Sequence, residues 1–239
     1  MKKLCLGLLF LAAACSSAPD TSKMSAEQLY DKGYDELQDT AWSKAAASFE
    51  KVELEHPYSK WAVKAKLMEA YAYYKDEKYD DAVLSLERFI RYHPGNKDIA
   101  YAYYMKGLCY YDQIVGSEKD QDNTAKAKEA FNQVIARFPG TEYAKDAQAK
   151  LVLIQDHLAG QEMEIGRFYL KQKNYLSALN RFAEVVKNYQ TTPQIEEALY
   201  REVEIYSLLG LKDEAAKVLR VFEHNYPKSK WYKKALKLN

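Results

Sequence analysis

The sequence lacks the residue patterns that most enzyme and metal sites require. It contains no glycine-rich phosphate-binding loop, no His-Glu-x-x-His zinc motif and no Gly-x-Ser-x-Gly nucleophile turn. The four histidines do not form a metal-binding pair, and His56 and His93 each directly precede a proline, which indicates a role in turns. We therefore expect no enzyme activity, no cofactor and no metal site.

The sequence also has few cysteines and almost no net charge. Two of the three cysteines lie within the first 15 residues, so Cys109 has no disulfide partner, and we expect a buried, unreactive thiol there. Basic and acidic residues number 35 and 34, which is not the positive excess that nucleic-acid binding requires. No apolar run after the N-terminal segment reaches the roughly 18 residues of a membrane-spanning helix.

The N-terminal segment has the features of a bacterial lipoprotein signal. It begins with Met-Lys-Lys and continues as an apolar run over residues 4–14, which is too short to span a bilayer. Three alanines directly precede Cys15. Ser16 follows the cysteine, as in lipoproteins that are sorted to the outer membrane.

From this pattern we predict a signal peptide over residues 1–14, a lipid such as palmitate on Cys15, and a flexible tether over residues 15–25. Leu11 lies four residues before the cysteine rather than the usual three. An ordinary signal peptide followed by an unrelated cysteine is therefore the alternative. With the lipid in place, the protein is expected on the periplasmic face of the outer membrane, attached by the lipid alone.

The rest of the chain is built on a repeat of 37 residues. Pro57 and Pro94 are separated by this interval, and so are Gly33 and Ala70. A small residue, apolar residues four and seven positions later, and a closing proline are typical of the second helix of a helix–turn–helix repeat. Such a unit cannot bury its apolar face alone, so its copies stack on one another.

Five copies can be aligned, and the pattern resembles the tetratricopeptide repeat. We predict an all-α solenoid over residues 26–239 with five helix pairs and a C-terminal capping helix. The predicted pairs cover residues 26–57, 63–94, 100–139, 141–190 and 196–227, and the capping helix covers residues 229–238.

Two copies are longer than the others. The third closes at Pro139, 45 residues after Pro94, and its polar residues 115–124 predict a loop that holds the eight extra residues. The fourth closes at Gln190, 51 residues after Pro139, but the added residues keep helical spacing. We therefore predict one long helix over residues 141–171, although Gly160 within it disfavours a helix by about 1 kcal/mol.

Tyrosine is abundant, with 21 residues, and many lie where the first helix of each repeat faces the concave groove of a solenoid. Such a surface suits an extended, aromatic-rich peptide. We expect these side chains to lie outside the core; the alternative is that they pack between helices, as we expect for Tyr73, Tyr103 and Tyr110. The predicted groove residues are Tyr30, Tyr34, Lys64, Tyr71, Tyr74, Tyr101, Tyr104 and Tyr111.

Residues 156–170, Asp-His-Leu-Ala-Gly-Gln-Glu-Met-Glu-Ile-Gly-Arg-Phe-Tyr-Leu, closely resemble the BamD family, the lipoproteins of the outer-membrane β-barrel assembly machinery. Residues 137–139, residues 175–182 and the insertion that contains residues 119–121 are similar to this family too. The resemblance covers nearly all of the chain after Cys15. It implies a scaffold that is not an enzyme and that binds no nucleic acid.

The resemblance also implies partners. The family docks on the POTRA domains of the BamA-like barrel-forming subunit through its C-terminal repeats, joins the other lipoproteins of the complex, and handles unfolded outer-membrane proteins at its N-terminal repeats. The groove positions become more charged toward the C-terminus, which favours docking there, although the lysines could simply solubilise the end of the chain. The predicted docking residues are Arg167, Tyr200, Glu204, Lys230 and Lys234.

Two other classes of protein compete with this interpretation. One is a different periplasmic repeat lipoprotein that regulates a cell-envelope enzyme. The other is an enzyme with its site in the groove, but no cluster of nucleophile, base or metal ligands in the sequence favours it.

Overall fold

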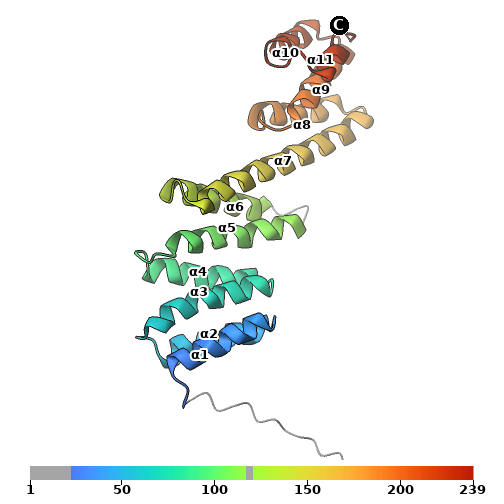
Figure 1. Ribbon diagram of the computed structural model, residues 1–239. Coiled ribbons are helices and arrows are strands. Elements are labelled where there is room, and N and C mark those ends of the chain that lie inside the picture. Colours follow the sequence, from blue (N-terminus) through green and yellow to red (C-terminus); the bar gives the residue numbers. More distant parts are fainter. Residues whose placement is uncertain (1–22, 117–120, 239) are drawn as a thin grey trace, which may run out of the picture. The chain divides into compact units, whose positions relative to one another are not determined.

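The computed structural model describes residues 23–116 and 121–238, and in these ranges the regular secondary structure is entirely α-helical (Figure 1). The prediction of an all-α tetratricopeptide-repeat fold is confirmed. The helices are α1 (Ala26–Gln38), α2 (Trp42–Glu55), α3 (Lys60–Lys75), α4 (Tyr79–Tyr92), α5 (Ile99–Gly116), α6 (Gln121–Arg137), α7 (Glu142–Lys171), α8 (Tyr175–Asn188), α9 (Ile195–Leu208), α10 (Lys212–Asn225) and α11 (Lys230–Ala235).

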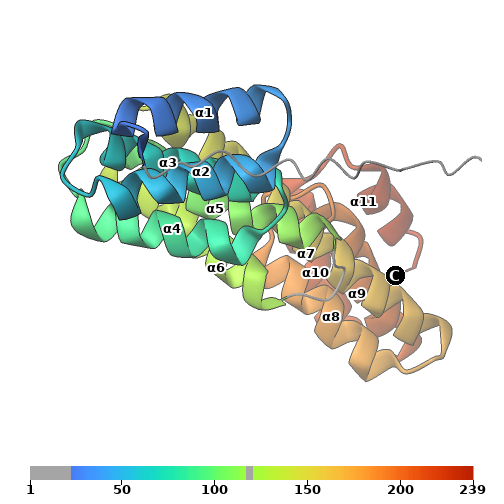
Figure 2. The same cartoon turned by 90° about the horizontal axis from the view of Figure 1, so that it is seen from below.

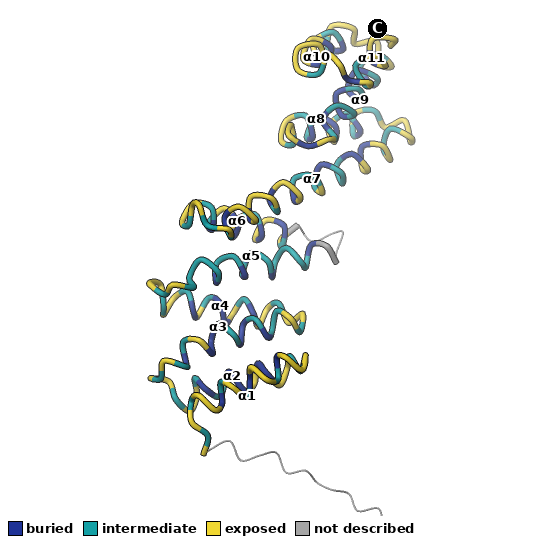
Figure 3. Tube along the Cα trace, in the orientation of Figure 1, coloured by how far each residue is buried: buried dark blue, intermediate teal, exposed yellow. Residues whose placement is uncertain are grey.

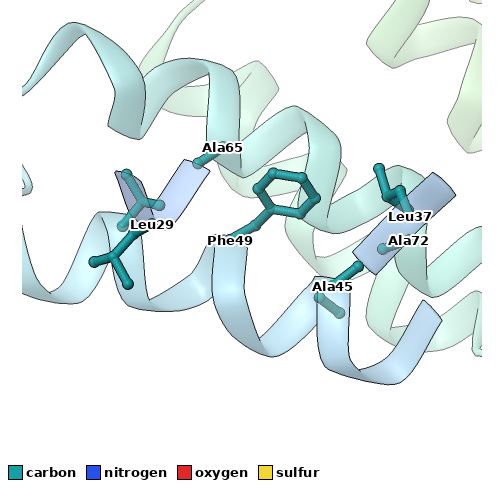
Figure 4. Packing of buried hydrophobic residues seen from close by; sticks show 8 residues of the cluster. Leu29, Leu37, Ala45, Phe49, Ala65 and Ala72 are labelled. Carbon is teal, nitrogen blue, oxygen red and sulfur yellow. The ribbon is translucent and has the colours of Figure 1, made fainter. Parts of the chain in front are cut away.

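The chain divides into two compact units, Met1–Ser85 and Leu86–Asn239, and the boundary falls within α4. In the first unit, α2 packs against both α1 and α3. The Phe49 ring of α2 is fully buried beside Leu29 of α1 and Ala65 of α3 (Figure 4). Burying such a side chain contributes roughly 1.5–3 kcal/mol, so this ring holds the first three helices together.

A glycine on the first helix of a pair lets a phenylalanine ring of the second helix come close. A β-carbon added to Gly33 would lie 2.8 Å from the ring of Phe49. The same contact recurs in the second unit, where Gly107 faces Phe131 and Gly166 faces Phe182. The repeated small residue in the sequence therefore reflects a repeated close packing of ring against backbone.

Polar residues define where helices begin. Ser25 accepts a hydrogen bond from the backbone N–H of Gln28, whose side chain accepts from the Ser25 backbone in return, and the two form a capping box at the start of α1. Ser59, Thr141 and Ser229 cap α3, α7 and α11 in a similar way. Replacing such a cap by alanine typically costs about 1 kcal/mol.

In the second unit, α7 takes part in two cores. Its first half buries Ala147 and Ile154 against α5 and α6, and its second half buries Ala159 and Met163 against α8. The helix runs unbroken from Glu142 to Lys171 (Figure 1), which confirms the predicted long helix, and its C-terminal half lies beside α8 in the second view as well (Figure 2). Gly160 is accommodated within it.

The predicted loop over residues 115–124 is wrong at both ends. The helix α5 continues to Gly116 and α6 begins at Gln121; residues 117–120 lie outside the described part of the chain. Packing stabilises helix here despite the polar sequence, because Ile114 and Thr124 are buried and the Asn123 side chain donates to that of Gln113 at 3.1 Å. Most of the extra residues therefore lengthen helices.

The predicted signal peptide and Cys15 lie outside the described residues, as does the predicted tether up to residue 22. The tether prediction is wrong for Met24. Its side chain packs against the core of the first unit, and its carbonyl accepts a hydrogen bond from Nε2 of His56 at 3.0 Å. The role of His56 in a turn is confirmed, since its carbonyl also accepts from the Ser59 backbone.

Burial follows the helix pairing. Buried residues lie on the sides of helices that face a neighbour, and exposed residues lie on the outer sides and in the turns (Figure 3). Among the described residues, no helix combines the length and apolar character needed to cross a membrane.

Candidate interaction surfaces

In the first unit, aromatic side chains of α1 and α3 meet beside the core. The Tyr30 ring lies 4.8 Å from that of Trp61 and 5.4 Å from that of Phe49. Lys64 places its ammonium group 4.8 Å from the Trp61 ring centre, a cation–π contact. Burial raises the pKa of the Tyr30 hydroxyl, and the nearby Tyr34 contributes.

The structure separates the predicted groove tyrosines into two kinds. Tyr34 is 47% exposed. The expectation that these side chains lie outside the core is wrong for four of them, because the apolar body of a tyrosine fills space between helices. Tyr30 and Tyr71 pack against the core of the first unit, and Tyr104 and Tyr111 pack against a core of the second. Tyr73, Tyr103 and Tyr110 pack between helices as predicted.

The second unit contains a group of tyrosines that joins α5 to the beginning of α7. The ring of Tyr143 lies 5.6 Å from Tyr101 and 5.4 Å from Tyr104. The Tyr104 hydroxyl donates to Asp146 at 2.5 Å. Burial, followed by this bond to a carboxylate, raises the pKa of Tyr104. Lys150 pairs with Asp146 at 3.6 Å.

Tyr143, Asp146 and Lys150 were missed by the sequence prediction. Lys150 also lies 4.9 Å from the ring of Tyr111, so α7 supplies as much of this surface as α5 does. The cap at Thr141 was a usable signal, since it makes the start of α7 equivalent to the first helix of a repeat. In the first unit, the remaining predicted tyrosine, Tyr74, meets Tyr79 edge to face at 5.9 Å.

At the C-terminal end, charged and aromatic residues form a connected cluster across α7, α9 and α11. Arg167 of α7 pairs with Glu197 of α9 at 3.3 Å, and Glu197 also pairs with Arg201 at 3.3 Å. Arg201 in turn donates to Glu204 at 2.8 Å. The guanidinium group of Arg201 lies 5.3 Å from the ring of Tyr200.

Trp231 joins the terminal helix to this cluster. Its ring lies 5.1 Å from that of Tyr200, and the ammonium groups of Lys234 and Lys230 lie 4.4 Å and 5.7 Å from its centre. All five predicted docking residues therefore belong to one cluster. Glu197, Arg201 and Trp231, which connect them, were not among the predicted docking residues.

Two buried titratable groups lie apart from these surfaces. Cys109 is fully buried, as predicted, and burial raises the pKa of its thiol to about 12, which disfavours the reactive thiolate. Glu202 of α9 is 6% exposed, and burial raises the pKa of its carboxyl to about 7. Nothing in the sequence singled out Glu202.

Among the described residues, no group of His, Cys, Asp and Glu could hold a metal ion.

Comparison with known proteins decides the family. Residues 22–221 match the model of the YfiO family, described as an outer membrane lipoprotein. A relative from Rickettsia prowazekii, named outer membrane protein assembly factor BamD, is 47% identical over 98% of this chain and 94% of its own length. The chain belongs to the BamD family.

Other members of the BamD family and some repeat proteins of known structure are similar as well. The BamD proteins of Caulobacter vibrioides and Neisseria meningitidis serogroup A are 43% and 36% identical, over 89% and 94% of this chain and 70% and 90% of their own lengths. Among solved structures, the TPR2AB domain of yeast Sti1 matches 88% of this chain and 81% of its own with a TM-score of 0.44 and 14% identity. The repeat protein YrrB matches 89% and 92% with a TM-score of 0.39 and 17% identity.

Proposed function

We propose that the protein is an assembly factor for outer-membrane proteins, a lipid-anchored scaffold that binds polypeptides and catalyses no reaction. The observation that carries this proposal is the 47% identity to a protein of that name over 98% of the chain. The fold agrees with it, because repeats of paired helices present extended surfaces that bind other polypeptides.

The C-terminal cluster is the proposed docking site for the POTRA domains of the barrel-forming subunit. Arg167 is 41% exposed at its side chain, and Lys230 and Lys234 are exposed on α11. Acidic Glu197 pairs with Arg167, and acidic Glu204 pairs with Arg201. Alternating charges around an aromatic anchor such as Trp231 favour a specific orientation of a partner.

The aromatic surfaces of the first four helix pairs are the proposed binding sites for unfolded outer-membrane proteins. Tyr34 and Lys64 are exposed in the first unit, and Trp61 lies beside Lys64. Tyr101 and Tyr104 present partly exposed rings in the second. Wide apolar rings with a polar edge suit alternating aromatic segments in an extended chain. The other lipoproteins of the complex are further proposed partners.

Co-purification of the barrel-forming subunit with the full-length lipoprotein tests the docking proposal. Reversing two charges with Lys230→Glu and Lys234→Glu is expected to lower recovery of the subunit at least tenfold, because both cations lie on the exposed terminal helix. The control reverses Lys44 and Lys97, two exposed lysines distant in sequence, and is expected to leave recovery unchanged. Full recovery with the first pair contradicts docking at this end, and absence of the subunit from the unmodified protein contradicts the proposed function itself.

A further inference from the structure

One face of α7 changes from covered to uncovered along its length. Ala147, Leu151, Ile154 and Leu158 follow one another at helical spacing and pack against α5 and α6. The same face continues beyond Leu158 at the same spacing, through Glu162, Ile165 and Tyr169. There Ile165 is 38% exposed. The covering helices therefore protect only the first half of this face.

The neighbouring helix pairs show what normally covers these positions. Ile165 directly precedes Gly166, the glycine under the Phe182 ring, and Glu202 has the equivalent place on α9. On α9 this face is covered by α8, whose Val186 packs beside Leu199, and Leu199 and Glu202 are only 1% and 6% exposed. Because α7 is long, its second half extends past α6 and does not pack against it. The position of one covering helix is therefore open.

A cleft opens at this place between α7 and α8. Its volume is about 380 Å³, and its lining is Glu162, Tyr169, Ser177, Asn180, Arg181 and Glu184. Arg181 donates to Glu162 at 3.1 Å but keeps 44% of its side chain exposed. The cleft thus combines a partly exposed cation with the ring of Tyr169, and Ile165 lies four residues before Tyr169 on the same face of α7.

We propose that this open face is a docking site for an amphipathic α-helix of a partner protein, which occupies the position of the missing covering helix. The chain itself indicates the chemistry of such a helix. In two other places the covering helix brings a carboxylate to a cation on the covered face: Glu53 of α2 pairs with Lys66 of α3, and Glu87 of α4 pairs with Lys106 of α5.

At the open face the exposed cation is Arg181, which belongs to α8 and borders this face of α7 through its pair with Glu162. The docked helix places apolar side chains at helical spacing against Ile165 and Tyr169 and directs an acidic side chain to Arg181. Ion pairing at this partly shielded position fixes the register of the helix. The inference deepens the proposed function and rests on it for the presence of a protein partner. It concerns a face distinct from the cluster around Trp231.

The test uses the full-length lipoprotein in its complex. A photo-cross-linking amino acid at position 165 is expected to join a partner segment that is helical and carries an acidic residue at the contact, as mapped by mass spectrometry. Ile165→Asp is expected to lower recovery of that partner at least tenfold. Arg181→Glu is expected to lower it about fivefold, and exchanging the mapped acidic residue for arginine is expected to restore it within twofold.

Leu153 provides the matched control. It is an exposed apolar residue on the same helix, and twelve residues at 3.6 per turn place it about 120° around the axis from Ile165. Leu153→Asp is expected to leave recovery of the partner unchanged, and thermal unfolding of both variants is expected to match that of the parent.

Three results overturn the inference: a cross-link to a strand or loop of a partner, a cross-link to this chain or a second copy of it, or unchanged recovery with Ile165→Asp. These results are distinguishable from failure of the proposed function. If a helical partner is found that has no part in β-barrel assembly, the docking site stands and the proposed function fails. If the barrel-forming subunit is retained while Ile165→Asp has no effect, the function stands and the helix site fails.

Discussion

Glu202 stands out among the individual residues because it is a carboxyl buried on a helix without a cation beside it that could offset its charge. Burial alone raises its pKa from 4.5 to about 7. The protonated form is favoured in the folded state, so the full stability is present below about pH 4.5 and is lost as the pH rises through 7. Ionisation at higher pH therefore costs about 3 kcal/mol, at about 1.4 kcal/mol per pKa unit.

Glu202→Gln is expected to raise the free energy of unfolding by about 2–3 kcal/mol at pH 8 and to change it little at pH 4.5, because the neutral amide imitates the protonated carboxyl. Urea denaturation at the two pH values measures this difference. Glu223→Gln, an exposed position on α10, serves as control with a change within about 0.5 kcal/mol. Equal effects of Glu202→Gln at both pH values contradict the assignment.

Tyr30 and Tyr34 lie four residues apart on α1 but differ in burial. Tyr30→Ala is expected to lower the free energy of unfolding by about 2–3 kcal/mol, since its ring packs on Phe49 and Trp61. Tyr34→Ala is expected to change stability by less than about 0.5 kcal/mol and to weaken binding of an unfolded outer-membrane protein. Denaturation and fluorescence anisotropy with a labelled client separate the two effects. Similar stability losses in both variants contradict this division.

This difference shows where sequence reasoning stops at the residue scale. Helical spacing placed both tyrosines on the groove side of α1, but spacing does not reveal which neighbouring ring fills the space beside each one. Trp231 was missed for a related reason. Its contacts join helices that are distant in sequence, and the repeat marks its position without revealing them: Trp61 lies four residues after Pro57, as Trp231 lies four after Pro227.

At the scale of the element, α7 contains two glycines that differ in the space available for a side chain: Gly166 is closely packed, and Gly160 is not. A β-carbon at Gly166 would lie 2.5 Å from the ring of Phe182, whereas at Gly160 the nearest atom is Nε2 of Gln194 at 4.0 Å. Gly166→Ala is expected to lower the free energy of unfolding by about 1–3 kcal/mol through overpacking. Gly160→Ala is expected to raise it by about 0.5–1 kcal/mol through helix propensity.

Thermal or urea unfolding of the two variants checks the prediction, and each serves as the control for the other because the substitution and the helix are the same. The same sign for both variants contradicts it.

The positions of the helices were largely predictable because the repeat supplies several markers for each one. The long α7 followed from uninterrupted helical spacing across Gly160. The predicted loop between α5 and α6 failed because polar composition was taken to mean irregular backbone. Burial of Ile114 and Thr124 stabilises helix on both sides of residues 117–120 instead, and such tertiary contacts are invisible in a single sequence.

At the scale of the whole molecule, membrane attachment is proposed to depend on Cys15. Cys15→Ser is expected to leave unprocessed precursor or to release the protein from the membrane fraction, because acyl chains contribute about 0.8 kcal/mol for each buried CH₂ group. Cell fractionation and intact-mass measurement check this. Cys109→Ser is the control and is expected to keep the protein in the membrane fraction. A membrane-bound parent without acyl mass contradicts the lipoprotein assignment.

The ordered Met24 has a consequence for where the protein can work. Its side chain and carbonyl both contact the first unit, and it lies only nine positions after Cys15 in the sequence. A fully extended chain covers at most about 3.5 Å per residue, so the segment from Cys15 to Met24 cannot span more than roughly 30 Å. With the proposed lipid on Cys15 in the outer membrane, the first unit would stay within a thin layer of periplasm next to that membrane. An unfolded outer-membrane protein bound to that unit, as proposed, would then be confined within a few nanometres of the bilayer that it enters.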